Sequence, residues 1–103
     1  EKDKYFHRYI GKVLERATGK VTELYEFLDS TGLEDKSRKL KTRELFEKGV
    51  IYYQEGQFFE ARKKFIDVIK IDGQDRLAKT YLFLCEKYQE QVPGEWQGIL
   101  EYL

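Results

Sequence analysis

The chain has 103 residues, which suits one small domain or a piece of a larger protein. Hydrophobic residues make up 41% of it and aromatic residues 16%, so a packed core can form. The 19 basic and 19 acidic residues cancel, which argues against the broad positive field that nucleic-acid binding relies on.

The N-terminal part of the chain is predicted to form a β-hairpin. Residues 5–14 and 20–28 are rich in aromatic and β-branched types, which favour strands. Residues 16–19 form a turn between them, in which Gly19 can take a positive φ angle. A two-stranded hairpin is marginal in water. This one therefore needs a sheet, a helix or another molecule to cover it.

A polar connector with a glycine, residues 29–35, precedes a segment of helical periodicity. From about Ser37, apolar residues recur at steps of three and four, which predicts an amphipathic helix. The residues that set this period are Leu40, Leu45, Phe46, Gly49, Tyr52 and Tyr53. We therefore divide the chain into a hairpin at 1–29, a linker at 30–36 and a helical domain at 37–103.

Two further helices are predicted. The second spans residues 58–71 and ends at Asp72 and Gly73. Its expected buried positions are Phe58, Ala61, Phe65, Val68 and Ile69. Asp75 is the expected N-cap of the third helix, which Pro93 ends. The apolar stripe of that helix is Leu77, Tyr81, Leu84, Cys85 and Tyr88. Residues 94–103 are expected to be irregular and to pack back on the bundle.

The first two helices resemble the 34-residue tetratricopeptide repeat, a helix-turn-helix unit with small and aromatic residues at fixed places. The matching positions are Leu45, Gly49, Tyr52, Gly56, Ala61 and Phe65. The resemblance places Gly49 opposite Ala61, with Phe65 one turn on. Lys48 and Gly73 depart from the pattern, and an ordinary pair of antiparallel helices stays open as the alternative. Phe83 stands where a second repeat needs a small residue, so the third helix is predicted to be a cap.

The order of these segments is similar to the C-terminal part of many bacterial class III adenylate/guanylate cyclases. There a terminal hairpin of the catalytic domain is followed by a short linker and a tetratricopeptide-like tail. The hairpin positions that match are Arg8, Gly11, Val13, Gly19, Lys20, Tyr25, Glu26 and Leu28. The tail positions that match are Asp75, Tyr81, Leu82, Cys85, Pro93, Trp96 and Gly98. The resemblance therefore covers nearly the whole chain, from Tyr5 to Gly98.

This resemblance implies that the chain holds only the end of the cyclase fold. In the family, the metal-binding aspartates and an asparagine–arginine pair lie upstream of the terminal hairpin, and no position here matches them. The fragment is therefore expected to lack catalytic, cofactor-binding and metal-binding residues, whereas its parent is a nucleotide cyclase, a lyase. The start at Glu1 rather than methionine agrees with a piece of a longer protein.

Independent enzymatic chemistry finds little support in the residues. His7 and Cys85 are the single histidine and the single cysteine. A buried cysteine and a surface histidine are expected rather than a catalytic pair. These two residues cannot complete a zinc site, and there is no glycine-rich phosphate loop. One cysteine cannot form an internal disulfide, and no apolar run approaches the roughly 20 residues that span a bilayer. A cytoplasmic location is expected, with any membrane anchor upstream in the parent.

Three functions remain open. The first is a regulatory or assembly module that docks a second copy, as a homodimer, or another signalling protein. Its candidate interaction surface is Phe6, Ile10, Tyr25, Phe27, Tyr53 and Trp96. The second is a free-standing tetratricopeptide adaptor that binds peptides, although Phe46 and Val50 stand where the resemblance would need carboxylate-binding residues. The third is nucleic-acid binding by the basic run at 36–43 with Tyr52 and Tyr53, which the neutral charge disfavours.

Overall fold

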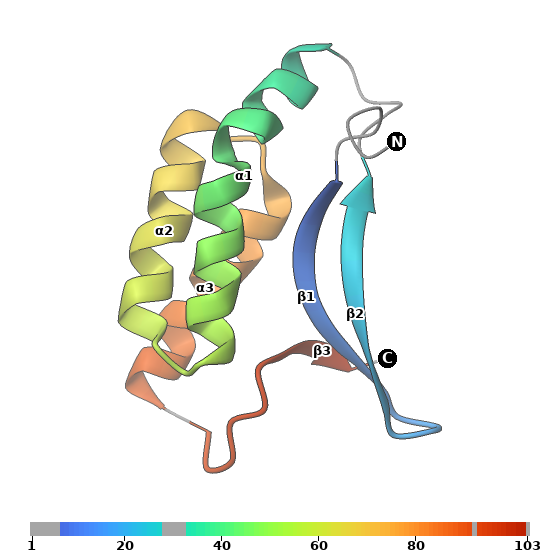
Figure 1. The fold of residues 1–103 in the computed structure, drawn as a ribbon. Coiled ribbons are helices and arrows are strands. Elements are labelled where there is room, and N and C mark those ends of the chain that lie inside the picture. The colour runs from blue at the N-terminus through green and yellow to red at the C-terminus, as the bar shows by residue number, and fades with distance from the viewer. Residues whose placement is uncertain (1–6, 28–32, 92, 103) are drawn as a thin grey trace.

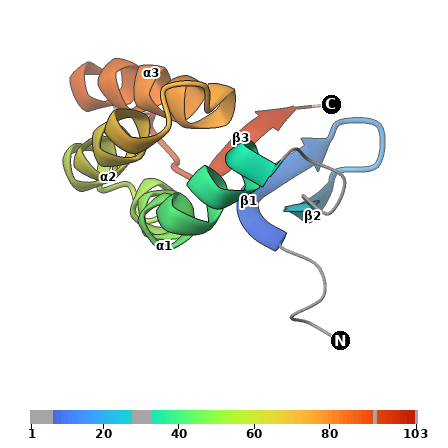
Figure 2. The ribbon, with the colours of Figure 1, turned by 90° about the horizontal axis from the view of Figure 1, so that it is seen from above.

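The computed structural model describes residues 7–27, 33–91 and 93–102 of the chain. Its elements are β1 (His7–Glu15), β2 (Lys20–Phe27), α1 (Leu33–Gln54), α2 (Phe58–Ile71), α3 (Arg76–Glu90) and β3 (Ile99–Tyr102). The described chain is mainly helical and begins with a β-hairpin, as the sequence predicts (Figure 1). The helices lie on one side and the sheet on the other (Figure 2).

β1 and β2 form the predicted antiparallel hairpin. Their pairing runs from His7 opposite Phe27 to Glu15 opposite Lys20. Gly19 closes the turn with a φ of 71°, and its N–H donates to the carbonyl oxygen of Glu15 at 2.8 Å. The predicted strands also reached three residues that lie outside the described part of the chain, Tyr5, Phe6 and Leu28.

The prediction of irregular structure over residues 94–103 is wrong for the last part of the described chain. Ile99–Tyr102 forms β3, which pairs in parallel with β1 and gives the strand order β2-β1-β3. Gly98 has a φ of 71° and lies against the backbone of Gln54, so the chain can turn there toward the sheet. A strand of four residues is hard to predict from the local sequence, because its formation depends more on pairing with a distant strand than on the propensities of its own residues.

The helix boundaries are mostly as predicted. α2 covers residues 58–71, and α3 follows its N-cap Asp75, whose carboxylate accepts a hydrogen bond from the Ala78 N–H at 3.2 Å. α1, however, begins at Leu33 rather than near Ser37, so part of the predicted 30–36 linker is helical. The first turn of α1 is polar in sequence and lacks the apolar periodicity on which the predicted start depends.

The core is built from one face of each helix. Its buried members are Phe46, Val50, Tyr53, Phe58, Ala61, Phe65, Val68, Ala78, Tyr81 and Cys85. Several predicted positions pack against this cluster but stay partly exposed, namely Leu45, Tyr52, Ile69, Leu77, Leu84 and Tyr88. Leu40 was expected to face inward, but its side chain is 52% exposed. Thr42 is buried instead, because its hydroxyl can donate to the Arg38 carbonyl oxygen within the same helix, at 3.1 Å.

Close packing of α1 on α2 depends on Gly49. A Cβ at this position would lie 2.7 Å from the nearest ring atom of Phe65, closer than real contacts allow. The tetratricopeptide resemblance places Ala61 opposite Gly49, whereas the atoms nearest to the missing Cβ belong to the Phe65 ring. Gly56 ends the turn between the two helices with a φ of 79°, as its predicted role requires.

Candidate functional site

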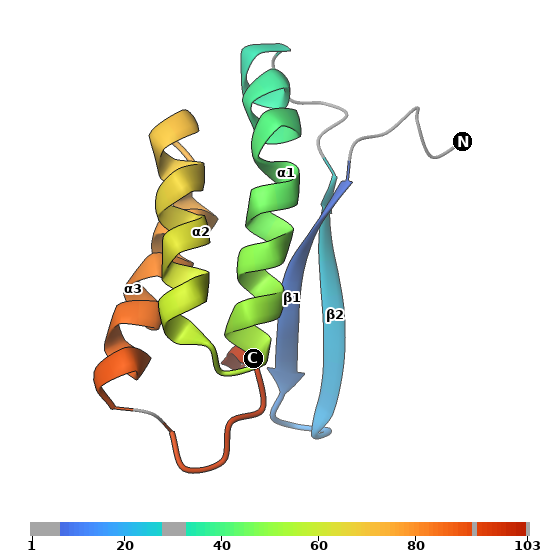
Figure 3. The same cartoon turned by 60° about the vertical axis from the view of Figure 1, so that its left-hand side comes forward.

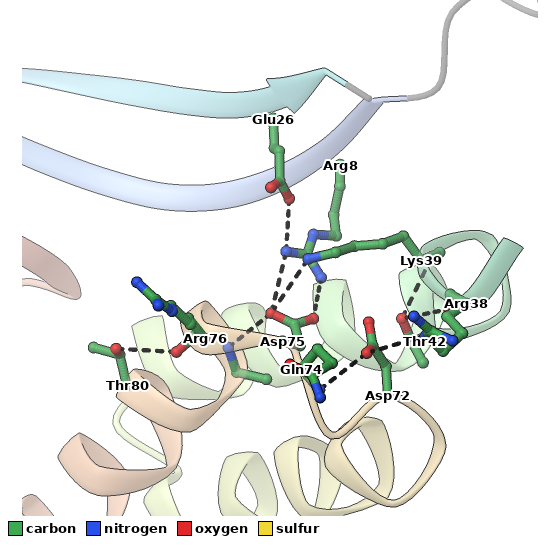
Figure 4. A network of polar contacts seen from close by, with 11 residues as sticks. Arg8, Glu26, Arg38, Lys39, Thr42, Asp72, Gln74, Asp75, Arg76 and Thr80 are labelled. Carbon is green, nitrogen blue, oxygen red and sulfur yellow. Dashed lines mark hydrogen bonds and ion pairs between the residues drawn. The ribbon is translucent and has the colours of Figure 1, made fainter. Parts of the chain in front are cut away.

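A buried ion pair joins the hairpin to the start of α3. Arg8 on β1 donates from Nη1 to Oδ2 of Asp75 at 2.7 Å and from Nη2 to Oε1 of Glu26 at 2.6 Å (Figure 4). The side chains of Arg8 and Asp75 are fully buried. Both of these acidic partners are brought to Arg8 by the fold, because Glu26 lies on the paired strand and Asp75 caps a helix.

Further contacts stabilise the charges of this pair. The guanidinium carbon of Arg8 lies 3.8 Å from the centre of the Phe46 ring, within the range of a cation–π interaction. Lys39 of α1 places its Nζ 3.6 Å from Oδ1 of Asp75. The hairpin, α1 and the N-terminus of α3 therefore meet at one polar cluster inside the molecule, which we call the Arg8 junction (Arg8, Glu26, Lys39, Phe46 and Asp75).

The Arg8 junction holds Asp75 in its charged form. Burial alone would raise the pKa of this carboxyl group, but the hydrogen bond and the charge of Arg8 lower it. The Ala78 N–H and the charge of Lys39 act in the same direction as Arg8. The pKa of Asp75 consequently lies below its usual value of 3.8.

Acid should therefore weaken the fold through Asp75. Because the folded-state pKa is lowered, the stabilisation is complete above the usual pKa and is lost as the pH falls from about 4 through the folded-state value. We expect the free energy of unfolding, measured by urea titration at several pH values, to fall less steeply below pH ~4 in Asp75→Asn, since asparagine still caps the helix. The exposed carboxylate variant Asp67→Asn should keep the wild-type slope, and equal slopes for Asp75→Asn and wild type would contradict the assignment.

A second contact lies beside the ion pair. The hydroxyl of Tyr81 on α3 donates to the carbonyl oxygen of Ile10 at 2.6 Å. The next residue, Gly11, has a φ of 128°, and a Cβ on it would overlap the Tyr81 hydroxyl. Burial raises the pKa of Tyr81 well above its usual value, so the phenol stays protonated and can donate.

The helical face that the resemblance assigns to peptide binding is filled by the chain itself. Phe46 lies under Arg8, Val50 is fully buried, and Tyr53 packs edge-on against Tyr81 and Trp96. Trp96 also donates from Nε1 to the carbonyl oxygen of Tyr53 at 2.7 Å. The face is therefore part of the core.

These contacts correct the candidate interaction surface. Tyr53 has no exposed area because α3 and the C-terminal segment cover it. Ile10 and Trp96 are partly buried and pack against the core cluster, so neither is a free surface residue. Phe6 lies outside the described residues. Of the predicted positions, Tyr25 and Phe27 remain exposed, at 52% and 64%.

The exposed apolar surface is instead concentrated on β2. Val21 and Leu24, which the sequence analysis did not single out, are 45% and 36% exposed beside Tyr25 and Phe27. β2 is an edge strand, and among the described residues β1 is its only sheet neighbour. The rings of Tyr25 and Phe27 lie about 6 Å from His7 between centroids. This apolar strand edge, which we call the β2 edge (Val21, Leu24, Tyr25 and Phe27), is the candidate interaction site.

The residues considered for chemistry lie apart in the fold. His7 is a half-buried residue on β1 beside the rings of β2, and Cys85 is buried in the core on α3. Burial raises the pKa of Cys85 to about 12, which keeps the thiol protonated at neutral pH. Within residues 7–27, 33–91 and 93–102, no group of three or more histidine, cysteine or acidic side chains is arranged to hold a metal. The described helices include none that is long and apolar enough to cross a membrane.

Comparison with protein families, with curated proteins and with solved structures finds no match to this chain. The pairing of Arg8 with Asp75 was not predicted from the sequence. A faint signal exists, because a charged residue on the inward side of a strand needs an opposite charge nearby. Its partner stands 67 residues away, so only the fold identifies it.

Proposed function

We propose that this chain is a non-catalytic interaction module from the C-terminal end of a bacterial class III adenylate/guanylate cyclase, where it supports dimerisation or docks a signalling partner. The observation that carries the proposal is the exposed, apolar β2 edge. Unpaired strand edges readily pair with other chains unless they are protected. A hairpin held rigidly by the Arg8 junction presents such an edge in a defined orientation.

The cyclase assignment is supported by the positions that carry the resemblance. Arg8 and Gly11 come from the hairpin part of the pattern, and Asp75 and Tyr81 come from the tail part. These residues contact one another across the fold. The two halves of the pattern are thus coupled by packing, as expected if they occur together in one family.

The alternative is a free-standing tetratricopeptide adaptor that is unrelated to cyclases. Such an adaptor would bind its peptide on the face of the first helix. Here that face includes Phe46, Val50 and Tyr53, which are fully buried. The buried face favours docking through the hairpin over peptide binding between the helices.

The coding sequence immediately upstream of Glu1 discriminates between the two proposals. The cyclase proposal requires the metal-binding aspartates and the asparagine–arginine pair to lie there. An upstream sequence without them would remove the cyclase assignment and leave the adaptor as the better proposal.

Self-association is tested by sedimentation of the chain over a range of concentrations. We expect a homodimer that Phe27→Lys disrupts, because lysine places a charge within the apolar contact. Phe83→Lys is the matched control, since Phe83 on α3 has the same 64% exposure as Phe27. A wild-type chain that stays monomeric at high concentration, or equal loss of dimer in both variants, would contradict docking through the β2 edge.

A further inference from the structure

The two acidic side chains of β2 have partners within the hairpin. Edge strands usually avoid unwanted pairing through free charges that face a neighbouring chain. On β2, however, Glu26 is paired with Arg8 and Glu23 accepts a hydrogen bond from the Tyr9 hydroxyl at 2.8 Å. Both carboxylates are thus engaged within their own hairpin. Val21, Leu24, Tyr25 and Phe27 of the same strand are apolar and exposed, and Lys20 stands at its end beside the turn.

We propose that β2 pairs antiparallel with β2 of a second copy, with the twofold axis passing at Leu24. This inference rests on the self-association in the proposed function and specifies its contact. A dimer of identical chains uses the same patch on both copies, so the strand must be complementary to itself. Residues that lie opposite each other in a sheet have side chains on the same face. This holds for two copies of β2 only if the twofold axis passes at a residue, because an axis between two residues would oppose side chains of different faces.

The pattern of charges selects Leu24 among the candidate axes. An axis at Glu23 would set the Glu23 carboxylate directly against its copy, and like charges that face each other across strands are destabilising. An axis at Tyr25 shortens the ladder, because fewer residues of β2 then overlap. An axis at Leu24 opposes no like charges.

The individual cross-strand residue pairs that an axis at Leu24 creates are also favourable. Val21 lies opposite Phe27 on both sides of the axis, and an aromatic ring against a β-branched residue is a stabilising cross-strand pair. Leu24 meets its copy at the centre. Thr22 lies opposite Glu26, and Glu23 lies opposite Tyr25, so each carboxylate faces an uncharged neighbour. The two hairpins then form one continuous sheet with their exposed rings on the same face.

Disulfide trapping of single-cysteine variants tests the register in the intact chain. In Leu24→Cys the two new thiols lie across the axis, where opposed Cα atoms are about 4.5–5.5 Å apart, within reach of a disulfide. We expect mild oxidation to link Leu24→Cys on the order of a hundredfold faster than the exposed control Phe83→Cys, since pairing raises the local thiol concentration. The native Cys85 is buried and does not interfere.

The outcomes separate this inference from the proposed function. A dimer by sedimentation that links rapidly through Glu23→Cys instead of Leu24→Cys overturns the register and leaves self-association standing. A dimer in which neither variant links faster than Phe83→Cys overturns pairing through β2. A chain that is monomeric overturns the inference and the self-association together, while the upstream sequence still decides the cyclase assignment. Circular dichroism of each variant verifies that it is folded.

Discussion

Replacing Arg8 by methionine should lower the free energy of unfolding by about 3–5 kcal/mol. The change removes the positive charge that faces Asp75, whose side chain has no exposed area. A buried carboxylate without its partner must either lose its charge or draw in water, and both are costly. Small domains are stable by only about 5–15 kcal/mol in total. Urea unfolding of Arg8→Met measures the loss directly.

The double variant Arg8→Met/Asp75→Ser is the control. Serine keeps the helix cap but carries no charge, so the double variant removes both fully buried charges and leaves only the partly exposed Lys39 and Glu26 without these partners. We expect it to be more stable than Arg8→Met alone, because replacing both members of a buried ion pair is often nearly neutral. If Arg8→Met changed the free energy of unfolding by less than about 1 kcal/mol, the ion pair could not be what holds the hairpin to α3.

Gly11→Ala should destabilise the chain by about 2–5 kcal/mol, the sum of backbone strain and overpacking. The φ of 128° at this position lies in a region that residues with a Cβ rarely adopt. The added methyl group would also overlap the Tyr81 hydroxyl, so β1 and α3 would have to move apart. Thermal unfolding followed by circular dichroism should show a clearly lower midpoint.

Tyr81→Phe separates the two causes. Phenylalanine removes the oxygen that the methyl group would meet, at the cost of the hydrogen bond to Ile10, about 1 kcal/mol. Gly11→Ala combined with Tyr81→Phe should therefore be less destabilised than the sum of the single variants. Strict additivity would show that the methyl group does not meet the Tyr81 hydroxyl, contrary to the packing of β1 on α3 described above.

The confirmed predictions share a local cause. The turn at Gly19, the span of α2 and the cap at Asp75 each follow from residues within a few positions of one another. A positive φ at glycine, an apolar period and a carboxylate before a helix act over one or two turns of chain. Such features can be predicted from the local sequence, without knowing against which other element the segment packs.

The errors arise where one element meets two others. α1 packs against α2 on one side and beside β1 on another (Figure 3), so its apolar period alone does not say which element covers each position. Tyr53 was predicted to lie on the interaction surface, but α3 and Trp96 cover it. β3 was missed for a related reason, because the free edge of β1 that it pairs with is formed by residues far back in the chain.

The sequence by itself determined the hairpin and the three helices, most of their boundaries and the glycines that the turns require. Only the tertiary structure decided that the hairpin packs against the helical core, that Arg8 meets Asp75, and that exposed apolar residues gather on the β2 edge. The reason is that secondary-structure propensities and helix caps arise from interactions between residues that are close in sequence. Burial and ion pairing, in contrast, depend on which distant segments come together.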